Sequence, residues 1–214
     1  NWEGKIVLQR ALDDATLAAS LRIPLEEARE RWDRARRRLF EKRLERVPPF
    51  LDRKVLTSWN GLMLATLAEA GRTLGQVGDP LSGDGVHFSS LAIQGARFLL
   101  QHLYQERLYH AWYEGQRSDA VFLEDYGALI LALLELYQSD FHPEWFATAR
   151  TLTQQMLDLF WDEQEGFFDV PPEHGLPFRT HHLEDNATPS GSALAVTALL
   201  LMSAFEGCQE WRNI

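Results

Sequence analysis

The sequence is poor in cysteine, in long apolar runs and in positive charge. Its one cysteine, Cys208, excludes an intramolecular disulfide, a Cys-x-x-Cys redox centre and a cysteine-based zinc site, so a cytoplasmic location is expected. The longest nearly apolar run, residues 193–205, is interrupted by Thr197 and Ser203 and is shorter than the ~20 residues of a membrane span. We therefore expect no membrane partner.

Positive charge is scarce overall, with 21 Lys and Arg against 31 Asp and Glu and a net charge of -10. A molecule of this charge repels nucleic acid, and no nucleic-acid partner is expected. The composition, 45% hydrophobic with only 14 Gly and 9 Pro, excludes a disordered or collagen-like chain. The first five residues lack the layout of a secretory signal and no initiator Met is present, which predicts a fragment or a processed chain.

Charge divides the chain into a helical arm with a linker, residues 1–50, and an acidic body, residues 51–214. Residues 24–46 carry nine Lys or Arg and six Asp or Glu, and the mixture indicates a solvated helix face in preference to an RNA-binding one. Apolar residues recur there at helical spacing and predict an amphipathic helix. They are Leu25, Ala28, Trp32, Ala35 and Leu39. The helix is expected to end at Val47-Pro48-Pro49-Phe50.

The body contains a repeat of spacing more than of residue identity. Three long apolar segments begin alike, and their glycines, Gly61, Gly127 and Gly191, are 66 and then 64 residues apart. Each segment is apolar nearly all round, which predicts inner helices buried on more than one face, with the outermost two at residues 57–74 and 189–206. Residues 91–102 and 145–159 have one apolar face and predict outer helices. Short aromatic segments at residues 107–113 and 166–170 follow them and resemble small strands.

Helical hairpins with doubly buried inner members pack into a toroid or α/α barrel. The expected fold is all-α, and the body has room for about two and a half hairpins of such a ring, because six units of ~65 residues need about 400 residues. The ring is thus incomplete within this chain.

Several motifs resemble one family of proteins. These motifs are Asn1-Trp2-Glu3-Gly4-Lys5, residues 37–43, residues 52–63, Glu124-Asp125-Tyr126-Gly127, residues 160–168 and residues 187–192. Together they resemble the YyaL or spermatogenesis-associated thioredoxin-like proteins over essentially the whole chain. The resemblance implies a thioredoxin-like domain, which this chain lacks, followed by a six-hairpin glycosidase-like (α/α)6 region that is also similar in fold to sugar 2-epimerases. It implies no settled activity for the helical region.

In such a ring the segments that lead into the inner helices gather at one mouth. Ser58, Glu124 and Thr188 occupy equivalent positions there, where helix capping alone also explains them. Helix N-termini aimed at one cavity present free N–H groups and partial positive charge to a hydroxyl-rich or anionic ligand. We therefore expect a binding site at this mouth.

The candidate catalytic residues are acids and a histidine at the mouth. Asp125 lies one residue into an apolar helix, where favourable placement on the helix dipole also explains it. Asp125 with Asp185 fits the carboxyl pair of a glycosidase, in which the two groups are ~5 to 9.5 Å apart. For Glu124 the same two explanations apply, a catalytic role or favourable placement on the helix dipole. His110, His181 and His182 lie in loops and suit proton transfer at neutral pH, as sugar epimerisation requires.

The candidate substrate-binding residues are aromatic or polar, and core packing is the alternative explanation for the aromatic ones. They are Trp59, Asn60, His110, Trp112, Tyr126 and Ser190. A metal at His181, His182 and Asp185 is disfavoured, since adjacent strand-like residues point to opposite faces. We predict neither a metal nor another cofactor.

Two functions from different classes follow. The first is a carbohydrate-acting or carbohydrate-binding domain that hydrolyses or epimerises sugars at the mouth. The second is a non-catalytic scaffold that partners the thioredoxin-like domain of the family. An incomplete ring also leaves apolar flanks on the outermost inner helices, and we expect a homo-oligomer to cover them.

Overall fold

A computed structural model describes residue 4 and residues 9–74, 88–175 and 177–212. The chain divides into two compact units, Asn1–Asp52 and Arg53–Ile214. Most of the first family-like motif, at residues 1–5, lies outside the described residues. Within the described residues, no helix is long and apolar enough to cross a membrane.

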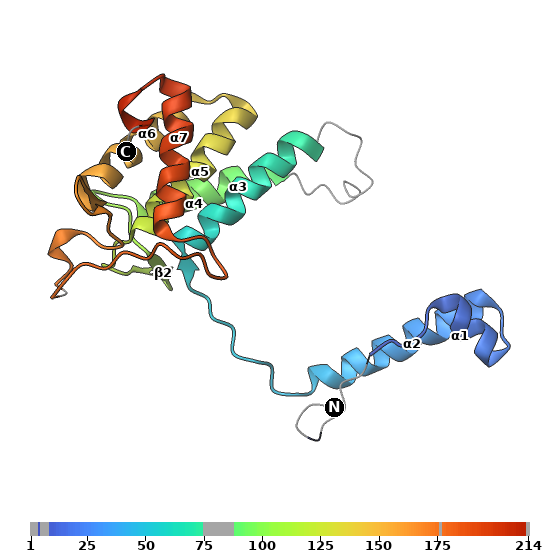
Figure 1. The fold of residues 1–214 in the computed structure, drawn as a ribbon. Coiled ribbons are helices and arrows are strands. Elements are labelled where there is room, and N and C mark those ends of the chain that lie inside the picture. Colours follow the sequence, from blue (N-terminus) through green and yellow to red (C-terminus); the bar gives the residue numbers. More distant parts are fainter. Residues whose placement is uncertain (1–3, 5–8, 75–87, 176, 213–214) are drawn as a thin grey trace. The chain divides into compact units, whose positions relative to one another are not determined.

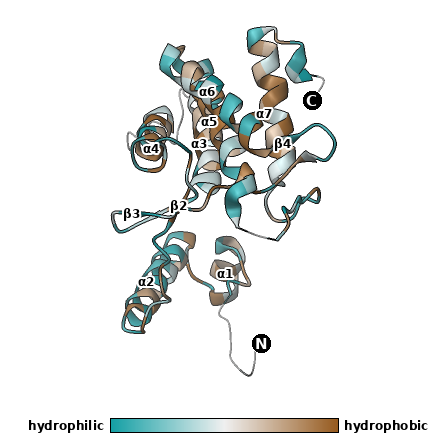
Figure 2. Ribbon diagram, turned by 90° about the vertical axis from the view of Figure 1, so that its left-hand side faces the viewer, coloured by the Kyte–Doolittle hydropathy of each residue, from teal (hydrophilic) through white to brown (hydrophobic). Residues whose placement is uncertain are grey.

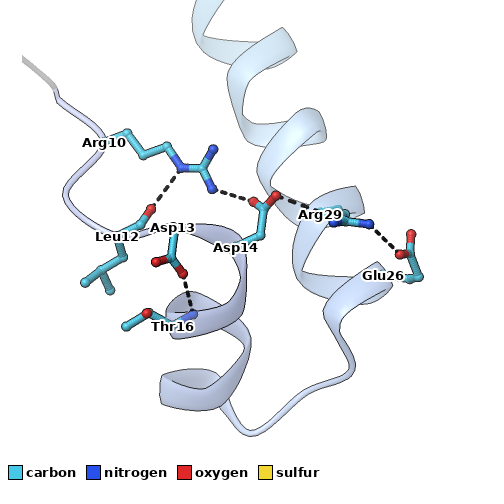
Figure 3. A network of polar contacts seen from close by, with 7 residues as sticks. All are labelled: Arg10, Leu12, Asp13, Asp14, Thr16, Glu26 and Arg29. Atoms are coloured by element: carbon cyan, nitrogen blue, oxygen red, sulfur yellow. Dashed lines mark hydrogen bonds and ion pairs between the residues drawn. The ribbon is translucent and has the colours of Figure 1, made fainter.

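The first unit is a pair of helices, α1 (Asp14–Leu21) and α2 (Leu25–Leu44). The predicted amphipathic helix is α2, and α1 was not predicted. Arg29 links the two helices, because its guanidinium lies 3.4 Å from Asp14 of α1 and 2.7 Å from Glu26 of α2 (Figure 3). The side chain of Asp13 caps α1 by accepting a hydrogen bond from the Thr16 N–H. Ala28 of the apolar stripe is fully buried, whereas Leu39 is exposed.

The second unit is built on three inner helices, α3 (Thr57–Leu74), α5 (Leu123–Asp140) and α7 (Gly191–Glu206). Helix α5 packs against both α3 and α7 and therefore lies between them (Figure 1). Its residues are buried nearly all round, as its apolar sequence predicted. Figure 2 shows hydrophobic residues along α5 and α7. These helices form the core of the unit.

Two of the three repeated glycines, Gly61 and Gly127, lie where inner helices approach each other closely. A Cβ added to Gly61 of α3 would lie 2.8 Å from the carbonyl carbon of Ala128 on α5. A Cβ added to Gly127 of α5 would lie 2.7 Å from the Cβ of Leu194 on α7. Both distances are shorter than real Cβ contacts, so only glycine permits this spacing between the helix backbones. The spacing of the repeat in the sequence thus has a structural cause.

The outer helices are α4 (Phe88–Leu103), which packs on α3, and α6 (Pro143–Phe160), which packs on α5. A short β excursion follows each of them. The first contains β2 (Ala111–Tyr113) and β3 (Gln116–Arg117), to which β1 (Val55–Leu56) adds as the third antiparallel strand. The second is the hairpin of β4 (Trp161–Asp162) and β5 (Gly166–Phe167). The predicted order of inner helix, outer helix and small β excursion is confirmed.

The start of the third inner helix was predicted two residues too early. Helix α7 begins at Gly191, and its N-cap is Ser190, whose Oγ accepts a hydrogen bond from the Ala193 N–H at 3.2 Å. Thr188 is therefore not the cap. Ser58 and Glu124 are not caps either, because α3 begins at Thr57 and α5 at Leu123, which places both side chains inside the first turn.

The flanks of the inner helices carry large exposed apolar side chains at i,i+4 spacing. They are Trp59 and Met63 on α3 and Val196 and Leu200 on α7, with exposed fractions between 43% and 62%. We expect the chain to self-associate through these flanks, because association removes apolar surface from water. Light scattering should show a mass that rises with concentration, and a Trp59→Glu, Met63→Glu double variant should lower it. Phe178→Glu, in an exposed loop, serves as control, and a wild-type monomer at high concentration would contradict the expectation.

Candidate functional site

The site begins with His110, which the β excursion holds beside the start of α5. The backbone N–H of Thr57 donates to the His110 carbonyl at 2.8 Å, and the His110 N–H donates to the Ala120 carbonyl at 2.9 Å. The imidazole packs edge-on against Phe122, with ring centroids 4.9 Å apart. Backbone bonds on both sides therefore fix the position of this histidine.

Asp125 is fully buried in the first turn of α5 and contacts two groups from other elements. Its Oδ1 accepts a hydrogen bond from the Ser58 N–H of α3 at 2.8 Å. Its Oδ2 lies 3.0 Å from Nδ1 of His110. With the carboxylate ionised, Nδ1 carries the proton and donates, which leaves Nε2 as the ring nitrogen available to a ligand. Next to it, Glu124 accepts a hydrogen bond from the Ser58 hydroxyl at 3.2 Å.

The pKa values of Asp125 and His110 are both raised. Burial raises the pKa of Asp125 to about 6, although its contact with His110 acts in the opposite direction. The hydrogen bond that Nδ1 of His110 donates to Asp125 raises the pKa of His110 above its ordinary value. A histidine in this arrangement exchanges protons near neutral pH and is held in one orientation while it does so.

His110 and Glu124 line a pocket of about 510 Å³ at the mouth. Its walls come from the start of α5, the loop between β5 and α7, and the start of α7. The lining residues are His110, Phe122, Glu124, Asp169, Val170, His174, Thr180, His182, Glu184, Asn186, Thr188, Pro189, Ser190 and Gly191. This volume is in the range of small-molecule sites.

A second imidazole–carboxylate pair lies in the same pocket. Nδ1 of His182 is 2.6 Å from Oδ2 of Asp169, and the His182 backbone N–H donates to Oδ1 of the same carboxylate at 3.2 Å. The backbone of Asp169 is itself fixed, because its carbonyl accepts from the Leu123 N–H and its N–H donates to the Thr180 carbonyl. The pocket thus holds two histidines whose Nδ1 atoms face carboxylates.

The structure does not place Asp185 and His181 with these groups. Asp185 accepts a hydrogen bond from the Ser190 N–H at 2.9 Å and so closes the turn before α7. His181 stacks on Phe168, with ring centroids 4.9 Å apart, and is exposed. Neither residue lines the pocket. The side-chain contact described for Asp125 is with His110, and the contact described for Asp185 is with the Ser190 N–H.

Of the predicted substrate-binding residues, His110 and Ser190 line the pocket. Tyr126 is corrected to a core residue: it is fully buried, and its hydroxyl accepts a hydrogen bond from the Leu108 N–H at 2.9 Å. Burial raises its pKa to about 12.

The other three predicted contacts lie outside the pocket lining. Trp112 packs edge-on against Phe98 at 5.3 Å, and Trp59 is 62% exposed on α3. The side-chain amide of Asn60 donates to the Leu56 carbonyl at 2.8 Å. Packing and local hydrogen bonds account for Trp112 and Asn60.

His110, Glu124 and Asp125 also have the side-chain types that bind metals, and their ligand-type atoms lie within 4.8 Å of one another. The hydrogen bonds within the cluster already engage both oxygens of Asp125 and Nδ1 of His110. These bonds account for the clustering, and no metal chemistry is assigned to it.

Asp169, His174 and Glu184 line the pocket but were not predicted as site residues. All three belong to the segment that follows the second outer helix, where no helical or strand periodicity indicates which side chains face inward. The one available signal was the aromatic strand-like segment at residues 166–170, which contains Asp169 and Val170.

Comparison with known proteins supports this architecture. No model of a known protein family matches the chain. The chain is 32% identical to human spermatogenesis-associated protein 20 over 99% of its own length, and it spans 28% of that protein.

Solved structures show the same fold at low identity. A sugar epimerase from a ruminal bacterium superposes with a TM-score of 0.60 at 16% identity, covering 77% of this chain and 43% of that chain. A family 76 glycoside hydrolase, a mannosidase from Bacteroides thetaiotaomicron, gives 0.53 at 14% identity, covering 75% and 42%.

At these identities the likeness concerns the fold, and it confirms the predicted partial (α/α)6 arrangement. The matched regions span less than half of each solved chain, in agreement with an incomplete ring. The sequence match to human spermatogenesis-associated protein 20 confirms the predicted resemblance to the spermatogenesis-associated proteins. The chain is homologous over nearly its whole length to spermatogenesis-associated protein 20, and its fold is similar to part of the (α/α)6 fold of sugar epimerases and glycoside hydrolases.

Proposed function

We propose that the second unit is a carbohydrate-acting domain that binds a sugar at the mouth of the inner helices and moves protons on it. The observation that carries the proposal is the His110 imidazole, which lines the pocket while buried Asp125 holds its Nδ1. The solved structures with the same fold include a sugar epimerase and a mannosidase, which supports a sugar as the ligand.

The side chains favour epimerisation over hydrolysis. Glycoside hydrolysis uses two carboxyl groups that flank the scissile bond. Asp125 is fully buried with both oxygens engaged, and Asp185 is engaged by the Ser190 N–H. Of the carboxyl groups that line the pocket, Glu124 accepts a hydrogen bond from the Ser58 hydroxyl and Asp169 holds His182. Imidazoles oriented by carboxylates are suited instead to taking up and returning protons near neutral pH.

The proposed step balances without an oxidant or a reductant. Nε2 of His110 accepts the proton from the carbon beside the carbonyl of an open-chain sugar. The C–H electron pair becomes the C=C bond of an enediolate, and the carbonyl oxygen takes the negative charge. A proton then adds to the opposite face of the same carbon, the C=C electron pair forms the new C–H bond, and the oxygen re-forms the carbonyl, which gives the epimer. His182 is placed to supply this proton from Nε2 when its imidazole is protonated, with Nδ1 held by Asp169 in the same pocket.

Calorimetric titration of the full chain with reducing mono- and disaccharides tests binding, and incubation of the bound sugars in D2O tests proton exchange. We expect at least one sugar to bind and to incorporate deuterium at the carbon beside the carbonyl, as followed by NMR. Release of monosaccharides without deuterium incorporation would instead support hydrolysis. If no sugar binds to the folded protein, the proposal is wrong.

A further inference from the structure

The pocket is lined by acidic groups. Glu124, Asp169 and Glu184 line it, and Asp125 lies behind the imidazole of His110. Among the described residues that form its walls, none is lysine or arginine. The field at the pocket is therefore negative whenever its histidines are neutral.

Three backbone amides at or near the N-termini of α3 and α7 are already engaged within the chain. The Ser58 N–H at the start of α3 already donates to Asp125, and the Ser190 N–H before α7 donates to Asp185. The Ala193 N–H donates to the Ser190 hydroxyl. Backbone amides at these helix starts were expected to bind a hydroxyl-rich or anionic ligand. Instead, the N–H groups of Ser58, Ser190 and Ala193 donate to carboxylates and a hydroxyl of the chain itself.

Two arginines that contact or adjoin the segment lining the pocket are also engaged. Arg107 forms an ion pair with Glu173. Arg179 donates to the carbonyls of Leu159 and Val170 and lies over the ring of Phe168. The charge of Lys54 acts on His110, but less strongly than the charges of Asp125 and Glu124 do.

From these contacts we infer that the pocket selects sugars by charge. It prefers a sugar with a protonated amino group over a neutral sugar, and it disfavours uronic and phosphorylated sugars. The inference rests on the proposed function and names the ligand class of the same site. Its physical cause is the attraction between the carboxylates and a cation, together with the repulsion of an anion from carboxylates that no lysine or arginine of the described lining offsets.

Three sugars that differ only at carbon 6 test the selection: 6-amino-6-deoxyglucose, glucose and glucuronate. They are titrated into the full chain at about pH 8, above the ordinary pKa of histidine. We expect the amino sugar to bind about tenfold more tightly than glucose, and glucuronate about tenfold more weakly. Both differences should shrink in about 1 M salt, where the screening length is only ~3 Å.

Glu184→Gln and Glu163→Gln form a matched pair of variants. Each removes one negative charge, but Glu184 lines the pocket and Glu163 lies exposed in the turn between β4 and β5. Glu184→Gln should lower the ratio of the affinity for the amino sugar to the affinity for glucuronate several-fold, and Glu163→Gln should leave this ratio unchanged. If glucose binds but glucuronate binds as tightly, or both variants act alike, the inference is overturned while the proposed function stands. If none of the three sugars nor any of the wider panel binds, both are overturned.

Discussion

Replacing Gly127 with alanine is expected to lower the free energy of unfolding by about 2–3 kcal/mol. The added Cβ would lie 2.7 Å from the Leu194 Cβ and 2.9 Å from its carbonyl carbon. Backbone atoms cannot rotate away as a side chain does, so α5 and α7 must separate and lose packing along their contact. The better helix propensity of alanine recovers only about 1 kcal/mol. Thermal or denaturant unfolding followed by circular dichroism measures the loss, which corresponds to roughly 4–12 °C in Tm.

Gly191→Ala is the matched control, since it changes the third glycine of the same repeat. Its nearest neighbours would be the Glu124 backbone nitrogen at 3.3 Å and side-chain atoms of Leu123 at 3.4 Å. Distances of 3.3–3.4 Å are tight, but small shifts of the neighbouring atoms relieve them without separating the helices. We expect a change within about 1 kcal/mol of wild type. Equal losses for Gly127→Ala and Gly191→Ala would show that close helix approach is not the reason for the repeat.

The same glycines explain why the fold was predictable from the sequence. Gly61 and Gly127 recur because each lets one inner helix approach the backbone of the next. The packing of the helices therefore requires glycine at these positions, and the requirement is visible as a repeat in the sequence. The apolar faces of residues 91–102 and 145–159 likewise report burial against a single neighbour. Helix α1 was missed, because its eight residues carry little helical periodicity and it is capped and held by polar contacts such as that of Asp13.

The site was predictable only as a region. His110 and Asp125 were both recognised as candidates, but their pairing depends on the antiparallel contact of β1 with β2, which sets the position of His110. The pairing of His182 with Asp169 depends on how the loop of residues 168–190 folds back. At the start of α7, Thr188 and Ser190 are both good caps by residue type, and the bond from the Ser190 N–H to Asp185 favours Ser190. Contacts of this kind leave no periodic signal.

The pairing of His110 with Asp125 leads to the largest functional effect that we expect. Asp125→Asn should lower the rate of proton exchange on a bound sugar by about 100- to 10,000-fold. The asparagine oxygen can still accept from the Ser58 N–H, but the amide nitrogen then faces Nδ1 of His110 as a donor. The proton of a neutral imidazole moves to Nε2, which removes the base from the ring nitrogen available to the sugar. His110→Gln should cause a similar loss, and sugar affinity should change only a few-fold in both variants.

His142→Gln is the matched control, because His142 is exposed at the start of α6 and does not line the pocket. Its exchange rate should remain within about twofold of wild type. NMR titration of the imidazoles adds a readout that needs no turnover, with His110→Gln identifying the resonance. Since the hydrogen bond that Nδ1 of His110 donates to Asp125 raises the pKa of His110, this pKa should lie above the ordinary value of about 6.5 in wild type and fall toward it in Asp125→Asn. The rate should accordingly rise with pH through the raised pKa, because the base must be deprotonated to accept a proton. An unchanged His110 titration in Asp125→Asn would mean that the buried carboxylate does not orient the imidazole.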